Sequence, residues 1–192
     1  MILQAGFFFN IDNIEYFCQK ELFDISKFNK LDITFNHKVV QSINDCFWEK
    51  EDFAPLKKYK GVIYKQKNSL IVYKNNISDN WITNIEYTAE KYNKKAVYIN
   101  IDSETNFPGY QLYFFNGIEK RIIYSIKDGS KWIFFNKGSP QNFEKNDMYI
   151  ERGATKKFNI AKLKFFCHNL GIEIDDPDLL KPVDKVIYTY TS

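Results

Sequence analysis

The stretch from Lys95 to Gly138 constrains the fold more than any other part of the chain. Four apolar runs follow one another there and read KAVYINI, GYQLYFF, KRIIYSI and KWIFF. Asn116-Gly117 and Asp128-Gly129 lie between three of these runs, and such pairs are a strong hairpin signal because both residues tolerate positive φ. The stretch therefore predicts an antiparallel meander of three or four strands.

The chain before the meander begins with a strand pattern over residues 2–9. Asp12-Asn13-Ile14-Glu15 then has the form of a capping box, which marks the start of a helix. Apolar residues follow at i, i+3, i+4 and i+8, and this spacing predicts one buried helix face made of Ile14, Phe17, Cys18 and Leu22.

We expect a second short strand over residues 31–35, followed by a helix that Asn36 caps and that ends before Pro55. Its apolar face would consist of Val39, Val40, Ile43 and Phe47. Residues 61–73 contain the runs GVIYKQ and LIVYK on either side of Lys67-Asn68-Ser69. This arrangement predicts a hairpin.

A polar stretch over residues 74–78 is the best candidate for a domain boundary, which would divide an N-terminal part (1–76) from the rest (77–192). One continuous sheet through both parts is the alternative. A helix that starts at Asp79 or Asn80 should follow, and its apolar stripe would be Ile82, Ile85, Ala89 and Tyr92.

The chain after the meander contains the helix with the clearest ends. Asn159 is placed to cap it, Gly171 stands where a left-handed residue ends a helix, and the apolar face is Leu163, Phe166, Cys167 and Leu170. An acidic turn at residues 175–178 comes next. We expect residues 185–191 to form a closing strand at the edge of the sheet.

Runs of strands bracketed by helices predict an α+β fold, with a mainly antiparallel sheet packed by three to four amphipathic helices. The meander strands do not alternate cleanly between apolar and polar residues, as a sheet with one wet face would. We expect the helices that start near Trp81 and Asn159 to cover one side. Either the rest of the chain or a partner would then cover the other side.

The composition bounds the class of function. The net charge is only +3, and Arg121 and Arg152 are the two arginines, which argues against a nucleic-acid partner. The three cysteines, Cys18, Cys46 and Cys167, fall in apolar patterns and are expected to be buried thiols. No basic leader precedes the apolar N-terminus, and no run is long enough for a membrane span, so we expect a cytoplasmic protein.

Catalytic patterns are weak. Cys167 and His168 are adjacent on the predicted helix and would not face each other, and the two histidines are too few for a His-rich metal site. Asp102 and Glu104 follow a strand, where a nuclease could hold a metal, but we interpret them as a solvated turn. Asp175, Asp176 and Asp178 lack the spacing of a calcium loop. We therefore expect no catalysis, no metal and no cofactor.

The surplus of aromatic residues in the meander favours a protein–protein interface, since Tyr, Trp and Phe are enriched there. The candidate contact residues are four aromatics and four acids: Tyr113, Phe115, Tyr124, Trp132, Asp102, Glu104, Asp175 and Asp176. Aromatic strands with lysines could instead stack single-stranded RNA. A nuclease that uses Asp102 and Glu104 is the enzymatic alternative.

Residues 81–177 resemble a known class of proteins in the order of their motifs. These motifs are WITxIEYTAEKY, FPGYxLYFF, KWxFF and HNLGIxIxDP. The pattern is similar to that of small bacterial immunity proteins, which are encoded beside polymorphic toxins of the Rhs, type VI secretion or contact-dependent inhibition type. The resemblance implies a protein that neutralises a cognate toxin by direct binding and has no catalytic residues of its own.

Overall fold

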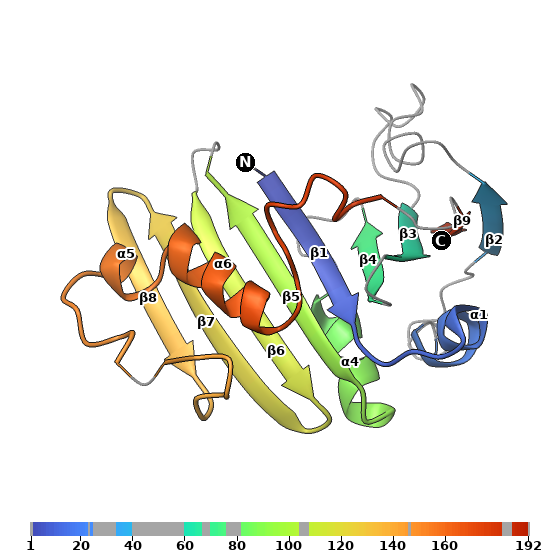
Figure 1. Cartoon of the computed structure of the whole chain (residues 1–192), viewed down its shortest axis with the longest axis horizontal. Coiled ribbons are helices and arrows are strands. Elements are labelled where there is room, and N and C mark those ends of the chain that lie inside the picture. The colour runs from blue at the N-terminus through green and yellow to red at the C-terminus, as the bar shows by residue number, and fades with distance from the viewer. Residues whose placement is uncertain are drawn as a thin grey trace.

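The computed structural model describes residues 2–22, 24, 34–39, 60–66, 70–75, 82–103, 108–145, 147–181 and 186–191. The strands in these ranges form one nine-stranded sheet in the order β2-β9-β3-β4-β1-β5-β6-β7-β8 (Figure 1). Every neighbouring pair is antiparallel. The predicted α+β fold with a mainly antiparallel sheet is confirmed.

The strands are β1 (Ile2–Phe8), β2 (Thr34–Val39), β3 (Lys60–Lys65), β4 (Ile71–Asn75), β5 (Lys95–Asp102), β6 (Gly109–Asn116), β7 (Glu119–Asp128), β8 (Lys131–Lys137) and β9 (Val186–Thr191). The helical elements are α1 (Ile14–Tyr16), the π-helix η1 (Phe17–Leu22), α4 (Ile82–Lys91), α5 (Ala154–Lys157) and α6 (Ile160–Asn169).

The predicted meander is confirmed as β5 to β8. Two of its connections are two-residue loops, Gly117-Ile118 and Gly129-Ser130, and the first residue of each has φ +57°. A type II′ hairpin turn requires positive φ at that first position, which glycine adopts without steric cost. The turn predicted at residues 106–109 lies partly outside the described residues.

Strand β1 joins the two parts of the chain into one sheet. It pairs with β4 on one side, where Gly6 lies opposite Tyr73, and with β5 on the other, where Gly6 lies opposite Tyr98. The hairpin of β3 and β4 is confirmed, although its turn lies outside the described residues. The boundary between residues 76 and 77 also lies outside them, so the division into two parts stays a prediction.

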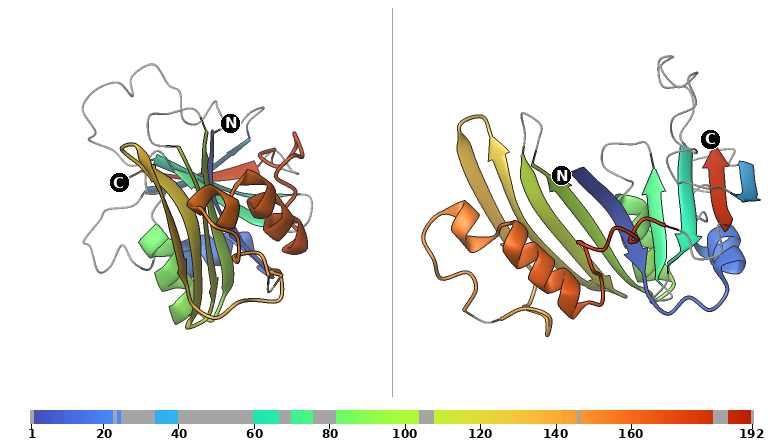
Figure 2. Two further views of the ribbon diagram at one scale, coloured as in Figure 1. Left: turned by 90° about the vertical axis from the view of Figure 1, so that its left-hand side faces the viewer. Right: turned by 45° about the horizontal axis from the view of Figure 1, so that its top comes forward.

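The two long helices cover opposite faces of the sheet, and the expectation that they share one face is wrong (Figure 2, left). Helix α4 packs Ile85 and Ala89 in a cluster with Tyr98 of β5, whereas Leu163 and Phe166 of α6 join the cluster of the other face. Successive residues of a strand point to opposite faces. The apolar run of β5 therefore supplies buried side chains to the core under each helix. This explains why apolar and polar residues do not alternate along the strand.

The predicted N-terminal helix is confirmed, with a different cap. Asn13, rather than Asp12, caps it, because the Asn13 Oδ1 atom accepts the Tyr16 backbone N–H at 2.9 Å. Three of the four predicted apolar residues are buried in the core of the α4 face, namely Phe17, Cys18 and Leu22.

Two predictions about the remaining strands are wrong. Asn36 does not cap a helix, since residues 34–39 form β2 and Asn36 lies opposite Thr189 in its ladder with β9; Val40, Ile43 and Phe47 lie outside the described residues. Strand β9 is not at the edge, because it lies between β2 and β3. Both errors have one cause: the partner strands are far apart in sequence, and local patterns carry no information about them.

The predicted ends of α6 are confirmed. Asn159 accepts the Lys162 backbone N–H at 3.1 Å through its side chain. At the other end Gly171 has φ +79°, and the Gly171 and Ile172 N–H groups donate to the carbonyls of His168 and Cys167. This is the bonding pattern of a Schellman motif, and buried Ile172 provides the apolar contact that accompanies it.

Gly138, just after β8, should not tolerate a side chain. Its φ is +91°, and a Cβ atom there would lie 2.0 Å from the carbonyl oxygen of Lys120, which belongs to the backbone and cannot move aside. Gly153 has a similar φ of +95° but open space around it. We predict from urea unfolding that Gly138→Ala costs at least about 2 kcal/mol more than Gly153→Ala. Equal losses would contradict the close backbone approach.

Candidate interaction surface

Among the described residues, no helix packs over one part of the sheet on the side that carries α4. Helix α4 packs on β5 and β6. Beyond it, side chains of β6, β7 and β8 point to the same side, as the cross-strand pairs show. We call this surface the open face, and it consists of Tyr113, Ile122, Tyr124, Ile126, Ile133 and Phe135.

The open face exposes large apolar side chains. Ile133 is 42% exposed and Phe135 is 37% exposed, although both lie on a regular strand. The Phe135 ring stacks on the ring of Tyr124, with centroids 4.8 Å apart and an interplanar angle of 11°. Such a continuous apolar surface on a strand pair is typical of a binding site rather than of scattered exposed residues.

Tyr113 forms the boundary between the open face and the core under α4. Its ring lies edge-on to Tyr98, with centroids 5.7 Å apart, and its hydroxyl donates to the Gln111 side chain at 3.4 Å. Burial, together with the nearby Tyr124 hydroxyl, raises the pKa of Tyr113. The neutral phenol therefore serves as the donor to Gln111 at the edge of the open face.

Lysines border the apolar residues of the open face. Lys131 and Lys137 stand at the two ends of β8 and point to the same side as Ile133 and Phe135. Within the ranges that the structure describes, neither lysine forms an ion pair, whereas Lys120 of β7 pairs with Glu86 of α4. Asp128 of β7 lies opposite Lys131 on the same side, whereas Lys137 lies opposite Ile122, so the rim carries two lysines and one acid.

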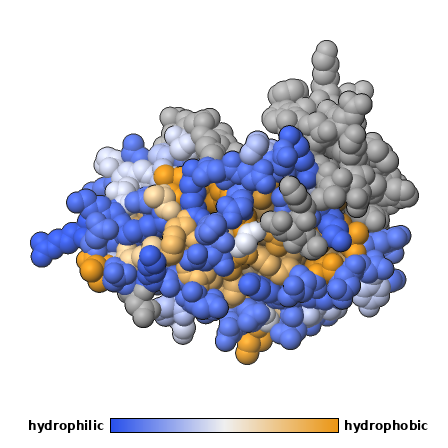
Figure 3. Space-filling model, in the orientation of Figure 1, coloured by the Kyte–Doolittle hydropathy of each residue, from blue (hydrophilic) through white to orange (hydrophobic). Residues whose placement is uncertain are grey.

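The structure separates the four aromatic residues that the sequence singled out. Tyr113 and Tyr124 lie on the open face, whereas Phe115 points to the same side but is buried in the core with α4. Trp132 lies on the other side of the sheet, where its ring stacks on Tyr110 with centroids 6.2 Å apart. Hydrophilic side chains surround apolar ones on that side, which Figure 3 shows.

The acidic candidates are dispersed too. Asp102 ends β5 opposite Gly109, and Glu104 lies outside the described residues. Asp175 pairs with Lys164 at 2.5 Å, and the Asp176 carboxylate accepts the Asp178 N–H at 2.8 Å. Asp102, Asp175 and Asp176, the three described acids, therefore do not form one site with the aromatics.

Ile133 and Phe135 are the most exposed residues of the open face, and the sequence interpretation did not include them among its candidates. Their signal is the two-residue period of β8, which puts Lys131, Ile133, Phe135 and Lys137 on one side.

Groups with nucleophilic or metal-binding chemistry do not gather in the described part of the chain. Burial raises the pKa of the Cys18 and Cys167 thiols far above the usual value, which makes both unreactive. His168 is exposed and contacts Glu173 at 2.6 Å instead of facing Cys167. Within these ranges, no three His, Cys, Asp or Glu residues come together as a metal would require.

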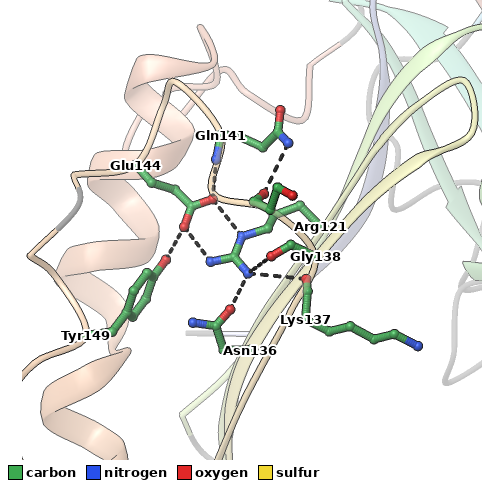
Figure 4. Close-up of polar contacts among 8 residues, drawn as sticks. Arg121, Asn136, Lys137, Gly138, Gln141, Glu144 and Tyr149 are labelled. Atoms are coloured by element: carbon green, nitrogen blue, oxygen red, sulfur yellow. Dashed lines mark hydrogen bonds and ion pairs between the residues drawn. The ribbon is translucent and has the colours of Figure 1, made fainter.

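A buried ion pair anchors the segment that follows β8 (Figure 4). Arg121 of β7 and Glu144 form two parallel bonds, Nε to Oε1 at 2.7 Å and Nη2 to Oε2 at 2.6 Å, and each side chain is 1% exposed. Arg121 also donates to the Asn136 side chain and to the carbonyls of Lys137 and Gly138.

The Glu144 carboxylate also has several hydrogen-bond donors around it. Its carboxylate accepts the Gln141 backbone N–H at 2.9 Å and the Tyr149 hydroxyl at 2.5 Å. Burial acts to lower the pKa of Arg121, but the bonds and charge of Glu144 outweigh it and raise that pKa. The pair therefore fixes residues 138–145 against β7, and Tyr149 is joined to it through Glu144. The sequence signal that we did not use is an arginine at a core-facing position of an apolar strand.

The chain matches no family model, and no curated protein and no solved structure matches it either. None of the described helices combines the length and the apolar character that a membrane crossing demands.

The ion pair generates a stability prediction. We expect Arg121→Met to lower the free energy of unfolding by about 3 to 5 kcal/mol, because Glu144 would be left as an unpaired buried charge. Adding Glu144→Leu should restore part of the loss. Lys164→Met, which breaks the exposed pair with Asp175, should cost less than about 1 kcal/mol. Urea unfolding measures all three, and equal losses for Arg121→Met and Lys164→Met would contradict the structural role.

Proposed function

We propose that this protein is an immunity protein that neutralises a cognate bacterial toxin in the cytoplasm by direct binding through the open face. The observation that carries the proposal is the exposure of Ile133 and Phe135 on a rigid strand pair. The resemblance of residues 81–177 to immunity proteins supports the same class of function.

The open face has the properties that a tight protein interface needs. Aromatic and aliphatic side chains form its centre, and lysines form its rim, as in interfaces with an apolar core and a polar rim. The strands hold these side chains in place before binding, so little conformational entropy is lost on association. Rigidity suits a protein that must block its target rather than transform it.

The surrounding structure supports this rigidity. Strand β8 pairs only with β7 in the described sheet, and the segment after it is fixed by Arg121 and Glu144. Phe134 of β8 also contacts Tyr149 of that segment, with ring centroids 5.7 Å apart. The far side of the strand is thus packed, while the open face stays accessible.

The test is co-purification of this protein with the toxin domain encoded beside it, followed by rescue of cells that express that toxin. We expect the wild type to bind and to rescue growth. Ile133→Lys combined with Phe135→Lys should weaken binding about 30-fold or more and abolish rescue, because the centre of the interface would carry two charges.

Ile118→Lys is the matched control. Ile118 is 82% exposed in the loop between β6 and β7, outside the open face, so its replacement adds a charge without changing the surface at issue. Circular dichroism should show that all variants are folded. Binding and rescue by the double variant at the wild-type level would exclude the open face, and no binding by the wild type would refute the immunity function.

A further inference from the structure

Strand β8 is an edge of the sheet with an unusual composition for an edge. The described strands end with it, and no backbone–backbone hydrogen bond outside its ladder with β7 reaches residues 131–137 from the described ranges. A terminal strand offers a row of N–H and C=O groups, and an extended segment of another chain can pair with them. Its seven residues, KWIFFNK, are four apolar residues followed by one asparagine and enclosed by two lysines.

The lysines decide which kind of segment fits. A second copy of β8 would pair antiparallel about Phe134, because two identical chains form a self-complementary contact. Lys131 of one copy would then lie opposite Lys137 of the other at both ends of the pair. Like charges directly opposite each other destabilise a strand pair, so this edge disfavours its own copy.

We propose that the β8 edge binds an extended acidic segment of the partner, which adds to the sheet as a further strand beside the open face. This inference rests on the proposed function and specifies the chemistry of the partner. The charge of the rim is its basis: Lys131 and Lys137 form no ion pair within the described ranges, and an acid opposite each on an added strand would give an attractive cross-strand pair. Asp128 already lies opposite Lys131 on the β7 side, whereas Lys137 lies opposite Ile122.

The geometry specifies the pattern of that segment. Side chains directly opposite each other on paired strands have Cβ atoms about 4.5 to 5.5 Å apart. The segment should therefore carry acids at positions i and i+6, facing the two lysines about 20 Å apart. Apolar residues at i+2 and i+4 would extend the exposed surface of Ile133 and Phe135. The residues between them face Trp132, Phe134 and Asn136 on the other side.

Synthetic heptapeptides test this proposal without knowledge of the partner. The probe is acetyl-Asp-Thr-Val-Thr-Val-Thr-Asp-amide, and its matched control has lysine in place of both aspartates. We expect the acidic peptide to perturb the backbone amide signals of β8 in NMR titrations and to bind about tenfold more tightly than the lysine peptide. The variant with Lys131→Glu and Lys137→Glu should reverse this preference.

A second probe separates strand pairing from side-chain contact alone. N-methylation of alternate peptide amides, tested in both registers, removes the donors needed for pairing while leaving the side chains. The peptide that is methylated at the amides facing β8 should lose binding, whereas the peptide methylated at the other amides should keep it. Equal binding of all peptides to both protein variants, or tight binding that no methylation affects, would overturn the proposal. A concentration-dependent dimer of the wild type that the charge reversal abolishes would overturn it in favour of a second copy.

These outcomes are distinct from those of the toxin experiment. Toxin binding that survives Lys131→Glu with Lys137→Glu would refute the acidic segment and leave the proposed function standing. Peptide binding without toxin binding would refute the toxin as the partner and retain the strand-addition site.

Discussion

The structure depends on a central strand that is apolar on both sides. In β5, Ala96 and Tyr98 point to one face and Val97 and Ile99 to the other, and all four are buried. A strand of this kind requires cover on each face, because leaving either set in water would forfeit most of its hydrophobic stabilisation. The positions of α4 and α6 on opposite faces follow from this requirement.

The two faces of the sheet differ in how far the described residues cover their apolar side chains. The α6 face extends to β8 because residues 138–145 and Tyr149 lie across it, held by Arg121 and Glu144. On the α4 face, α4 packs on β5 and β6, and the side chains of β7 and β8 remain partly exposed. Over β7 and β8, the α4 face is therefore less covered by described residues than the α6 face.

Sequence patterns predicted the local features well and the long-range ones poorly. The meander, its glycine turns and both ends of α6 were predictable because the deciding contacts join residues close in sequence. The place of β9 and the strand state of Asn36 were not predictable, since their partners lie more than a hundred residues away.

For the candidate surface, the sequence identified Tyr113 and Tyr124. It also named Trp132, which points to the opposite side, and it overlooked Ile133 and Phe135. The face to which each strand residue points separates the exposed residues from the buried ones. That assignment requires the positions of the helices, which the sequence does not provide.

The insertion of β9 between β2 and β3 also has a consequence for synthesis on the ribosome. Tyr188 of β9 lies opposite His37 on one side and Ile63 on the other. Until residues 186–191 emerge, β2 lacks the one strand that it pairs with in the described sheet, and β3 has one free edge there, although β5 to β8 can already pair as a local meander. The end of the sheet beyond β3 is therefore the last to form, and until then β3 instead of β2 is the terminal strand of the described sheet at that end.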